Sequence, residues 1–162
     1  MDLNNTVSTL SDQTRIWIYQ SSRKFTAEEV LDIKEQLQHF AQGWVSHNQA
    51  LKAQGQLLYD QFVILMVDES QAGASGCSID SSVSFVRRLQ QQYGVDFFDR
   101  MTFAWKEGEE VRTAHKDEFA RLYHEGEINN ETLVFDNLAA TKADFDKAWL
   151  KPLGESWHVR MV

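Results

Sequence analysis

The stretch from Gly73 to Ser82 has the composition in this chain that is best suited to ligand binding. It reads Gly-Ala-Ser-Gly-Cys-Ser-Ile-Asp-Ser-Ser, so small side chains leave the backbone accessible. A helix that begins here directs free N–H groups at an anion, which predicts a binding site. The residues that we expect to line this site are Ser75, Gly76, Cys77, Ser78, Asp80 and Ser81. The alternative is a tight turn with an aspartate cap, and the nearby carboxylates of Asp68 and Glu69 favour it because they oppose anion binding.

The thiol of Cys77 is the candidate nucleophile, because a cysteine at the start of a helix can have a lowered pKa. His47 lies 30 positions before it and His158 lies 81 positions after it, and either imidazole is a candidate base. Asp80 or Asp68 would orient that base. A thiol enzyme therefore requires these residues to meet in one cleft. The alternative is that Cys77 is a small buried residue without chemistry, which is the common case.

Trp157 and His158 form a second candidate ligand-binding pair, near the end of the chain. Indole rings stack flat ligands, but tryptophans at core-like spacing more often pack inside the protein. We expect Trp157 to be the most exposed of the five tryptophans.

Metal and nucleotide motifs are missing from the sequence. It contains no His-x-x-x-His, Cys-x-x-Cys or His-Glu-x-x-His pattern, so we predict no metal site. It has no Gly-Lys dipeptide, no Gly-x-Gly-x-x-Gly and no Gly-x-Ser-x-Gly, so we predict no phosphate-binding loop, no cofactor and no nucleophile elbow. Asp68 and Glu69 end an apolar strand, where carboxylates either serve a site or simply reach water.

The elements that position these residues follow from the hydrophobic pattern. Thr26 and Glu29 form a capping box before an apolar stripe with helical spacing, which predicts a helix over 27–45. Short β-rich runs predict strands at 15–19, 51–59, 62–67 and 97–105, and a second helix is expected from Asp80 or Ser81 to Gly94. The pattern also predicts short strands at 111–114 and 132–135 and short helices at 117–124 and after Thr141.

The order of these elements predicts an α+β fold. Residues 15–105 read β-α-β-β-α-β, which is the order of a ferredoxin-like plait. Residues 1–14 are predicted to form a loose arm, and residues 106–162 an α/β extension of the sheet. At 162 residues, we expect one domain over 1–162.

Composition narrows the class of protein further. The net charge is −8, which argues against nucleic acid and against an anionic membrane surface as partners. A soluble cytoplasmic protein is predicted from three features: the single cysteine, a longest apolar run of only six residues, and the polar N-terminus. Because ferredoxin-like sheets often pair through edges or faces, a homodimer is one expectation.

Several segments together resemble a family of short proteins from Bacteroidetes-type bacteria that are commonly labelled "ABC transporter ATPase". The segments are Arg15–Gln20, Trp44–His47, Phe62–Ser70, Ser75–Asp80, Asp99–Arg100, Val134–Asn137 and Ser156–His158, which span nearly the whole chain. The label implies ATP hydrolysis, yet the chain lacks the Walker A lysine and the Leu-Ser-Gly-Gly-Gln signature. Only the Val67-Asp68-Glu69 ending is similar to a Walker B strand. The resemblance therefore assigns no catalytic residue.

Three functions follow as hypotheses. The missing catalytic motifs favour a non-enzymatic binding or interaction module for an unknown small molecule or protein. A thiol or metal-assisted enzyme centred on Cys77 is the alternative. An ATP-linked function, as the family label implies, is disfavoured because phosphoryl transfer needs positive charge at the phosphates.

Overall fold

The computed structural model describes residues 10–70 and 72–162, and it has the mixed α+β character that the sequence predicts. The chain divides into two compact units, which we describe separately. The first unit comprises Met1–Phe98 and Ala139–Asp146, and the second comprises Asp99–Leu138 and Lys147–Val162. Residues 1–9 of the predicted arm lie outside the described residues, while Leu10 and Thr14 are both buried.

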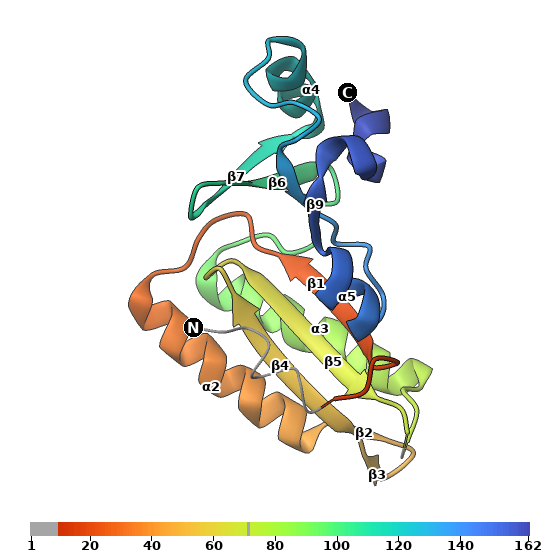
Figure 1. Cartoon of the computed structure of the whole chain (residues 1–162). Coiled ribbons are helices and arrows are strands. Elements are labelled where there is room, and N and C mark those ends of the chain that lie inside the picture. The colour runs from red at the N-terminus through yellow and green to blue at the C-terminus, as the bar shows by residue number, and fades with distance from the viewer. Residues whose placement is uncertain (1–9, 71) are drawn as a thin grey trace. The chain divides into compact units, whose positions relative to one another are not determined.

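A three-stranded antiparallel sheet forms the centre of the first unit (Figure 1). Its order is β1-β5-β4, where β1 is Arg15–Gln20, β4 is Lys52–Leu58 and β5 is Phe62–Asp68. Every residue of β5 is buried, because this apolar strand has a neighbour on each edge and cover on each face. The strands predicted at 15–19, 51–59 and 62–67 are therefore confirmed.

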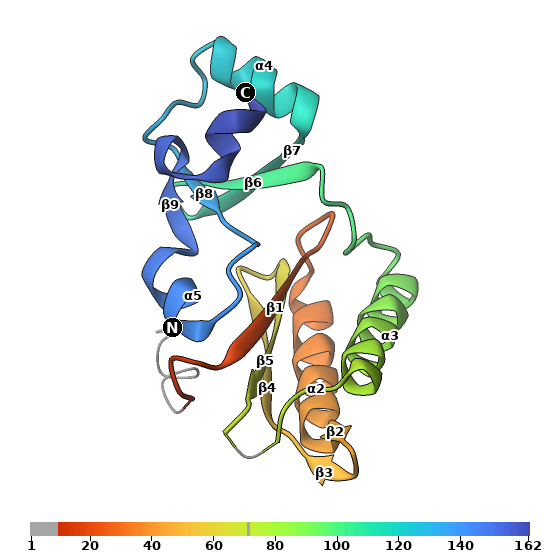
Figure 2. The ribbon, with the colours of Figure 1, turned by 90° about the vertical axis from the view of Figure 1, so that its right-hand side faces the viewer.

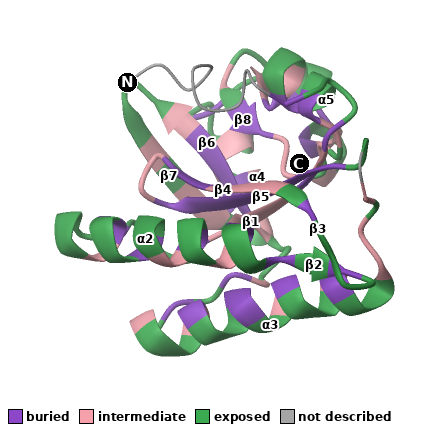
Figure 3. Ribbon diagram, turned by 90° about the horizontal axis from the view of Figure 1, so that it is seen from below, coloured by how far each residue is buried: buried purple, intermediate pink, exposed green. Residues whose placement is uncertain are grey.

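Two helices, α2 (Ala27–Gly43) and α3 (Gly76–Tyr93), lie on the same side of this sheet, and α5 (Lys142–Ala148) lies on the other side (Figure 2). The predicted capping box of Thr26 and Glu29 begins α2. Both helices bury one stripe against the sheet and expose the opposite side (Figure 3). Their core residues include Val30, Ile33, Leu37, Phe85, Val86 and Leu89, which pack with Val63, Leu65 and Val67 of β5.

The second helix begins earlier than predicted. Ser75 caps α3 and forms a reciprocal hydrogen-bonded box with Ser78, so the prediction that Asp80 or Ser81 caps this helix is wrong. Several serines and aspartates in a row offer competing caps, and the first one able to form the reciprocal pair begins the helix. Gly94 ends α3 in the left-handed conformation, with φ of 62°, as predicted.

The first sheet has the strand order of a split β-α-β unit, but the predicted fourth strand does not join it. β6 (Thr102–Glu107) pairs with β7 (Glu110–His115) and with β8 (Leu133–Phe135) in the second unit. Residues 96–101 form two turns instead, in which Asp96 and Asp99 accept backbone N–H groups two residues ahead. The edge of β1 is met by residues 140–142 instead: the Ala140 carbonyl accepts from the Ile16 N–H at 3.0 Å.

A small hairpin links α2 to β4, and the sequence pattern did not predict it. Its strands are β2 (Val45–Ser46) and β3 (Gln49–Ala50), which pair in antiparallel register. His47 and Asn48 between them have positive φ angles of 50° and 65°, which is the geometry of a tight hairpin turn.

The second unit contains a four-stranded antiparallel sheet of order β7-β6-β8-β9, in which β9 is Leu150–Pro152. The predicted hairpin, the helix near 117–124 and the strand near 132–135 are confirmed as β6–β7, α4 (Lys116–His124) and β8. Two short 3-10 helices, η1 (Leu153–Glu155) and η2 (Trp157–Met161), end the chain. Their side chains join a core that includes Phe103, Trp105, Phe119, Ile128, Val134 and Leu153. In the described part of the chain, each helix is too short or too polar to cross a lipid bilayer.

Candidate functional site

The loop before α3 satisfies its own hydrogen bonds. The Ser75 Oγ accepts from the Ser78 N–H at 3.2 Å, and the Ser78 Oγ accepts from the Ser75 N–H at 2.7 Å. The Ala74 N–H donates to the Glu69 carboxylate at 2.9 Å. The N–H groups of Ala74, Ser75 and Ser78 therefore already have partners, and one of these partners carries a negative charge. This arrangement gives the predicted anion site little support.

Cys77 lies in the first turn of α3 with an exposed side chain. Gly76, Asp80 and Ser81 share this exposed turn, and the Ser81 Oγ donates to the Cys77 carbonyl at 3.1 Å. Within the described residues, the thiol itself has no hydrogen-bonded imidazole or carboxylate that would withdraw its proton. An activated thiol needs such a neighbour.

His47 lies in the turn of the β2–β3 hairpin, and its side chain is exposed. The hairpin is held near the start of α3, because the Trp44 indole N–H donates to the Ser78 carbonyl at 2.8 Å. That contact brings His47 toward the same end of the helix as Cys77, but no hydrogen bond between these two side chains is found in the described chain.

His158 and Trp157 are part of the packing of the second unit. The His158 ring is 1% exposed, stacks on the Trp157 indole at 3.7 Å between centroids, and contacts Phe103 and Phe119. Its Nδ1 lies 2.6 Å from the Ser156 Oγ. Burial lowers the pKa of His158 to about 4, so the ring is neutral near pH 7. This neutral ring is enclosed in the core of the second unit, whereas Cys77 belongs to the first.

Trp157 is half-buried, and its indole N–H is already occupied. The N–H donates to the Asp136 Oδ1 at 2.9 Å, while the Lys151 Nζ donates to the Asp136 Oδ2 at 2.8 Å. Burial raises the pKa of Asp136, but the hydrogen bonds from Lys151 and Trp157 outweigh this effect, and the pKa lies below its usual value. The charged carboxylate therefore fixes Trp157 in place, which favours a structural role for this residue.

Asp68 ends β5 as the sequence indicated, and its carboxylate is buried and used for structure. The Ser70 N–H donates to it at 3.0 Å, and the Lys52 Nζ lies 3.5 Å away. The Ser70 hydrogen bonds are the main cause of its lowered pKa. For residues 10–70 and 72–162, no three His, Cys, Asp or Glu side chains gather in an arrangement that could hold a metal ion.

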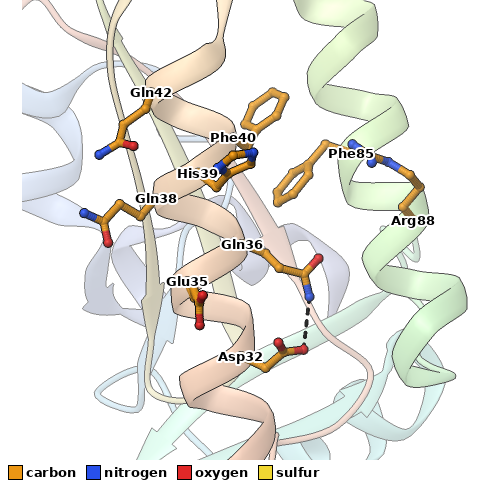
Figure 4. Close-up of a pocket in the computed structure, with 9 residues that line it drawn as sticks. All are labelled: Asp32, Glu35, Gln36, Gln38, His39, Phe40, Gln42, Phe85 and Arg88. Atoms are coloured by element: carbon orange, nitrogen blue, oxygen red, sulfur yellow. Dashed lines mark hydrogen bonds between the residues drawn. The ribbon is translucent and has the colours of Figure 1, made fainter.

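A groove between α2 and α3 is lined by aromatic, acidic, basic and amide side chains (Figure 4). Its volume is about 640 Å³. Two aromatic rings form its floor: Phe40 of α2 and Phe85 of α3 stack with centroids 4.4 Å apart and planes 11° from parallel. The Trp44 ring extends this stack, with its centroid 5.1 Å from that of Phe40. The groove therefore has a largely buried pair of stacked rings beneath a polar rim, with Phe85 only 4% exposed.

One end of the groove is closed by a hydrogen-bonded cluster between the helices. The Asp32 carboxylate accepts from the Tyr93 hydroxyl, from the Gln36 amide at 3.1 Å and from the Gln92 amide at 3.3 Å. Gln36 also reaches the Tyr93 hydroxyl at 3.1 Å. This cluster holds α2 and α3 at a fixed separation, so the groove is shaped before a ligand arrives.

Arg88 and Glu35 provide the free charges of the rim. The Arg88 guanidinium carbon lies 5.7 Å from the centroid of Phe85, so the cation rests beside the aromatic floor. Both side chains are exposed, and neither forms an ion pair with another described residue. His39 and Gln42 of α2 line the same space (Figure 4). An uncommitted guanidinium beside stacked rings suits recognition of a carboxylate attached to an apolar body.

Phe40 belongs to the apolar stripe that predicted the helix over 27–45, and the sequence did not single out Phe85 or Arg88 as functional. The available signal was weak: Arg87 and Arg88 are the only basic residues between Lys52 and Arg100, and Arg88 follows Phe85 by three positions on one helix. Their meeting with Phe40 depends on how two helices pack, which the sequence pattern does not specify.

Comparisons of this chain with models of protein families, with curated proteins and with solved structures found no match in any of the three.

Proposed function

We propose that this protein is a non-enzymatic binding module whose site is the groove between α2 and α3. The observation that carries the proposal is the uncommitted Arg88 guanidinium beside the stacked rings of Phe40 and Phe85. A site needs a surface that excludes water and a polar group that fixes orientation, and this groove provides both. Its volume of about 640 Å³ is in the range of sites for small organic ligands and side chains.

The chemistry of the groove points to a ligand that joins an apolar ring to a carboxylate. The ring would pack against the half-buried Phe40 at the edge of the Phe40–Phe85 stack, and the carboxylate would accept paired hydrogen bonds from Arg88. Glu35 and Asp32 repel a second negative charge near the α2 side of the rim, which favours a single carboxylate over a phosphate. Such a ligand is either a free aromatic acid or an aromatic residue beside an acidic one in a partner protein.

The other two hypotheses have less support. A Cys77-centred enzyme needs a base, but the His158 ring is enclosed in the second unit and His47 forms no hydrogen bond with the thiol in the described chain. An ATP-linked function needs positive charge at a phosphate cradle, while the Glu69 carboxylate binds the Ala74 N–H in the loop before α3.

Titration of the wild-type protein with 3-phenylpropionate and with 3-phenylpropylamine tests this proposal, because the two probes share a ring and differ in the sign of their charge. Two-dimensional NMR would follow the indole N–H of Trp44, whose ring contacts Phe40. We expect the acid to shift this signal in a saturable way and the amine to bind at least tenfold more weakly. Equal binding of both probes, or a saturable shift for neither, would contradict the proposal.

A further inference from the structure

A second hollow lies on the other side of α2, along the outer edge of β4. Its volume is about 390 Å³, and its lining combines α2 residues such as Lys34 and Ala41 with the consecutive residues 53–58 of β4. A hollow lined by consecutive residues of a strand follows the strand's edge rather than one of its faces. β4 pairs only with β5 in the part of the chain that the structure describes. Its outer edge therefore offers backbone N–H and C=O groups to another strand.

This edge lacks the features that usually prevent strand pairing. Residues 53–58 read Ala-Gln-Gly-Gln-Leu-Leu, without a charge or a proline. The register with β5 is continuous from Lys52↔Asp68 to Leu58↔Phe62, so no bulge twists the edge away. Proteins usually protect exposed edges with lysine, proline or bulges. Because these features are absent over six consecutive residues, the edge is suited to pairing with another strand.

Gln56 gives a second, independent indication that this edge has a partner. It is 7% exposed, and in the part of the chain that the structure describes neither its amide oxygen nor its amide nitrogen has a hydrogen-bond partner. A buried amide without partners is costly, roughly 1–3 kcal/mol, and native proteins rarely leave one in that state. Gln56 lies on the sheet face opposite Gly55, whose added Cβ would meet Leu37 of α2. A residue directly opposite Gln56 on a neighbouring strand would lie on that same face, in position to supply these hydrogen bonds.

A second copy of β4 supplies them by symmetry. When two β4 strands pair in antiparallel register around Gly55, residue 55 faces its own counterpart and Gln56 faces Gln54 of the second copy. Directly opposed residues lie on the same face of a sheet, so the Gln56 amide meets another amide there. Gly55 at the centre has no side chain to oppose its own counterpart across the strand pair.

The charges of this edge are compatible with the same pairing. Each chain carries a net charge of −8, so two copies repel except where their surfaces are uncharged or complementary. In this register the two Lys52 side chains lie at opposite ends of the strand pair, roughly 20 Å apart, which exceeds the screening length of about 8 Å. Each Lys52 instead has an ion-pair partner in its own chain, since its Nζ lies 3.5 Å from the Asp68 carboxylate.

We propose that this protein forms a symmetric homodimer through antiparallel pairing of β4 with β4 of a second copy, which makes one continuous six-stranded sheet. The inference is independent of the ligand groove, since that groove lies on the side of α2 toward α3. A protein that fails to dimerise could still bind a ligand in the groove, and the reverse also holds, so the two proposals can fail separately.

The oligomeric state of the full chain at increasing concentration tests the proposal. Sedimentation velocity is expected to show twice the chain mass of 18.7 kDa at high concentration, with dissociation on dilution. Gln54→Lys places a positive charge against Gln56 of the other copy and should weaken association at least tenfold. Gln49→Lys makes the same chemical change at an exposed position of β3 and should leave association unchanged. A monomer at every concentration, or equal weakening by both variants, would overturn the proposal.

Cysteine pairing tests the register itself, in a background with Cys77→Ser. One sample carries Gln54→Cys, a second carries Gln56→Cys, and circular dichroism confirms that both variants are folded. We expect a disulfide-linked dimer when the two samples are mixed and oxidised, and little in either sample alone, because position 54 faces position 56. Absence of the mixed product, or equal cross-linking within each separate sample, would overturn the assigned register.

Discussion

Gly55 is a position where α2 packs closely on β4, and its replacement by alanine has a predictable effect on stability. An added Cβ would lie 3.1 Å from the Leu37 Cδ2, 3.2 Å from the Leu37 Cβ and 3.3 Å from the Leu65 Cδ2. A methyl end can rotate away, but the Leu37 Cβ is fixed to the helix backbone. Overpacking of this kind costs about 1–3 kcal/mol. Alanine in a strand recovers roughly 0.5–1 kcal/mol of backbone entropy, so we expect Gly55→Ala to destabilise the first unit by about 1–2 kcal/mol.

Urea unfolding measured through the Trp44 indole signal reports on the first unit, because this N–H is bound to the Ser78 carbonyl. With a denaturant slope of about 2 kcal/mol/M, the midpoint should fall by roughly 0.5–1 M. Gly43→Ala is the matched control: no atom lies within 4 Å of its added Cβ, so alanine should raise stability slightly at this end of α2. A Gly55→Ala variant as stable as the wild type would refute the close packing of α2 on β4.

The other predictions concern the residues that the sequence first selected. Because the pKa of His158 is about 4 in the folded protein and about 6.5 when unfolded, the unfolded chain binds more protons between these values, so stability rises with pH from 4 to 6.5. His158→Phe should remove up to about 3 kcal/mol of this rise in the stability of the second unit. His124→Gln, at an exposed position, should keep the rise. The measurement is the urea midpoint at pH 4.5 and at pH 7, and an equal change of midpoint in the two variants would contradict the burial of His158. Cys77→Ala should change neither the affinity for 3-phenylpropionate nor the melting temperature, because the thiol is exposed outside the groove; a large loss of affinity in calorimetry would return Cys77 to the site.

Local patterns in the sequence correctly identified the helices and strands that are determined by residues close together in the chain. The capping box of Thr26 and Glu29 and the apolar stripe after it correctly placed α2, because both signals act within a few turns of one helix. The uniformly apolar run from Phe62 to Val67 correctly indicated a central strand. Gly94 correctly ended α3 because few other residues adopt the left-handed conformation.

Features that depend on distant parts of the chain were not predictable in the same way. β6 pairs with β7 through a local hairpin, but whether its other edge joins the first sheet or β8 depends on segments far apart in sequence, not on its own residues. The groove likewise arises only when Phe40 and Phe85 meet across two helices. Cys77 and His158 attracted interest by residue type alone, and their environments point to an exposed helix turn and a packed core.

The most direct test of the proposed binding site compares Arg88→Ala with Arg87→Ala. The two arginines are adjacent on α3, both rest on a phenylalanine ring, and only Arg88 lines the groove. Calorimetric titration with 3-phenylpropionate should show a tenfold or greater loss of affinity for Arg88→Ala, since a charged hydrogen bond contributes roughly 1.5–3 kcal/mol. Arg87→Ala should bind like the wild type. Equal affinities for the two variants would contradict the assignment of this groove as the ligand site.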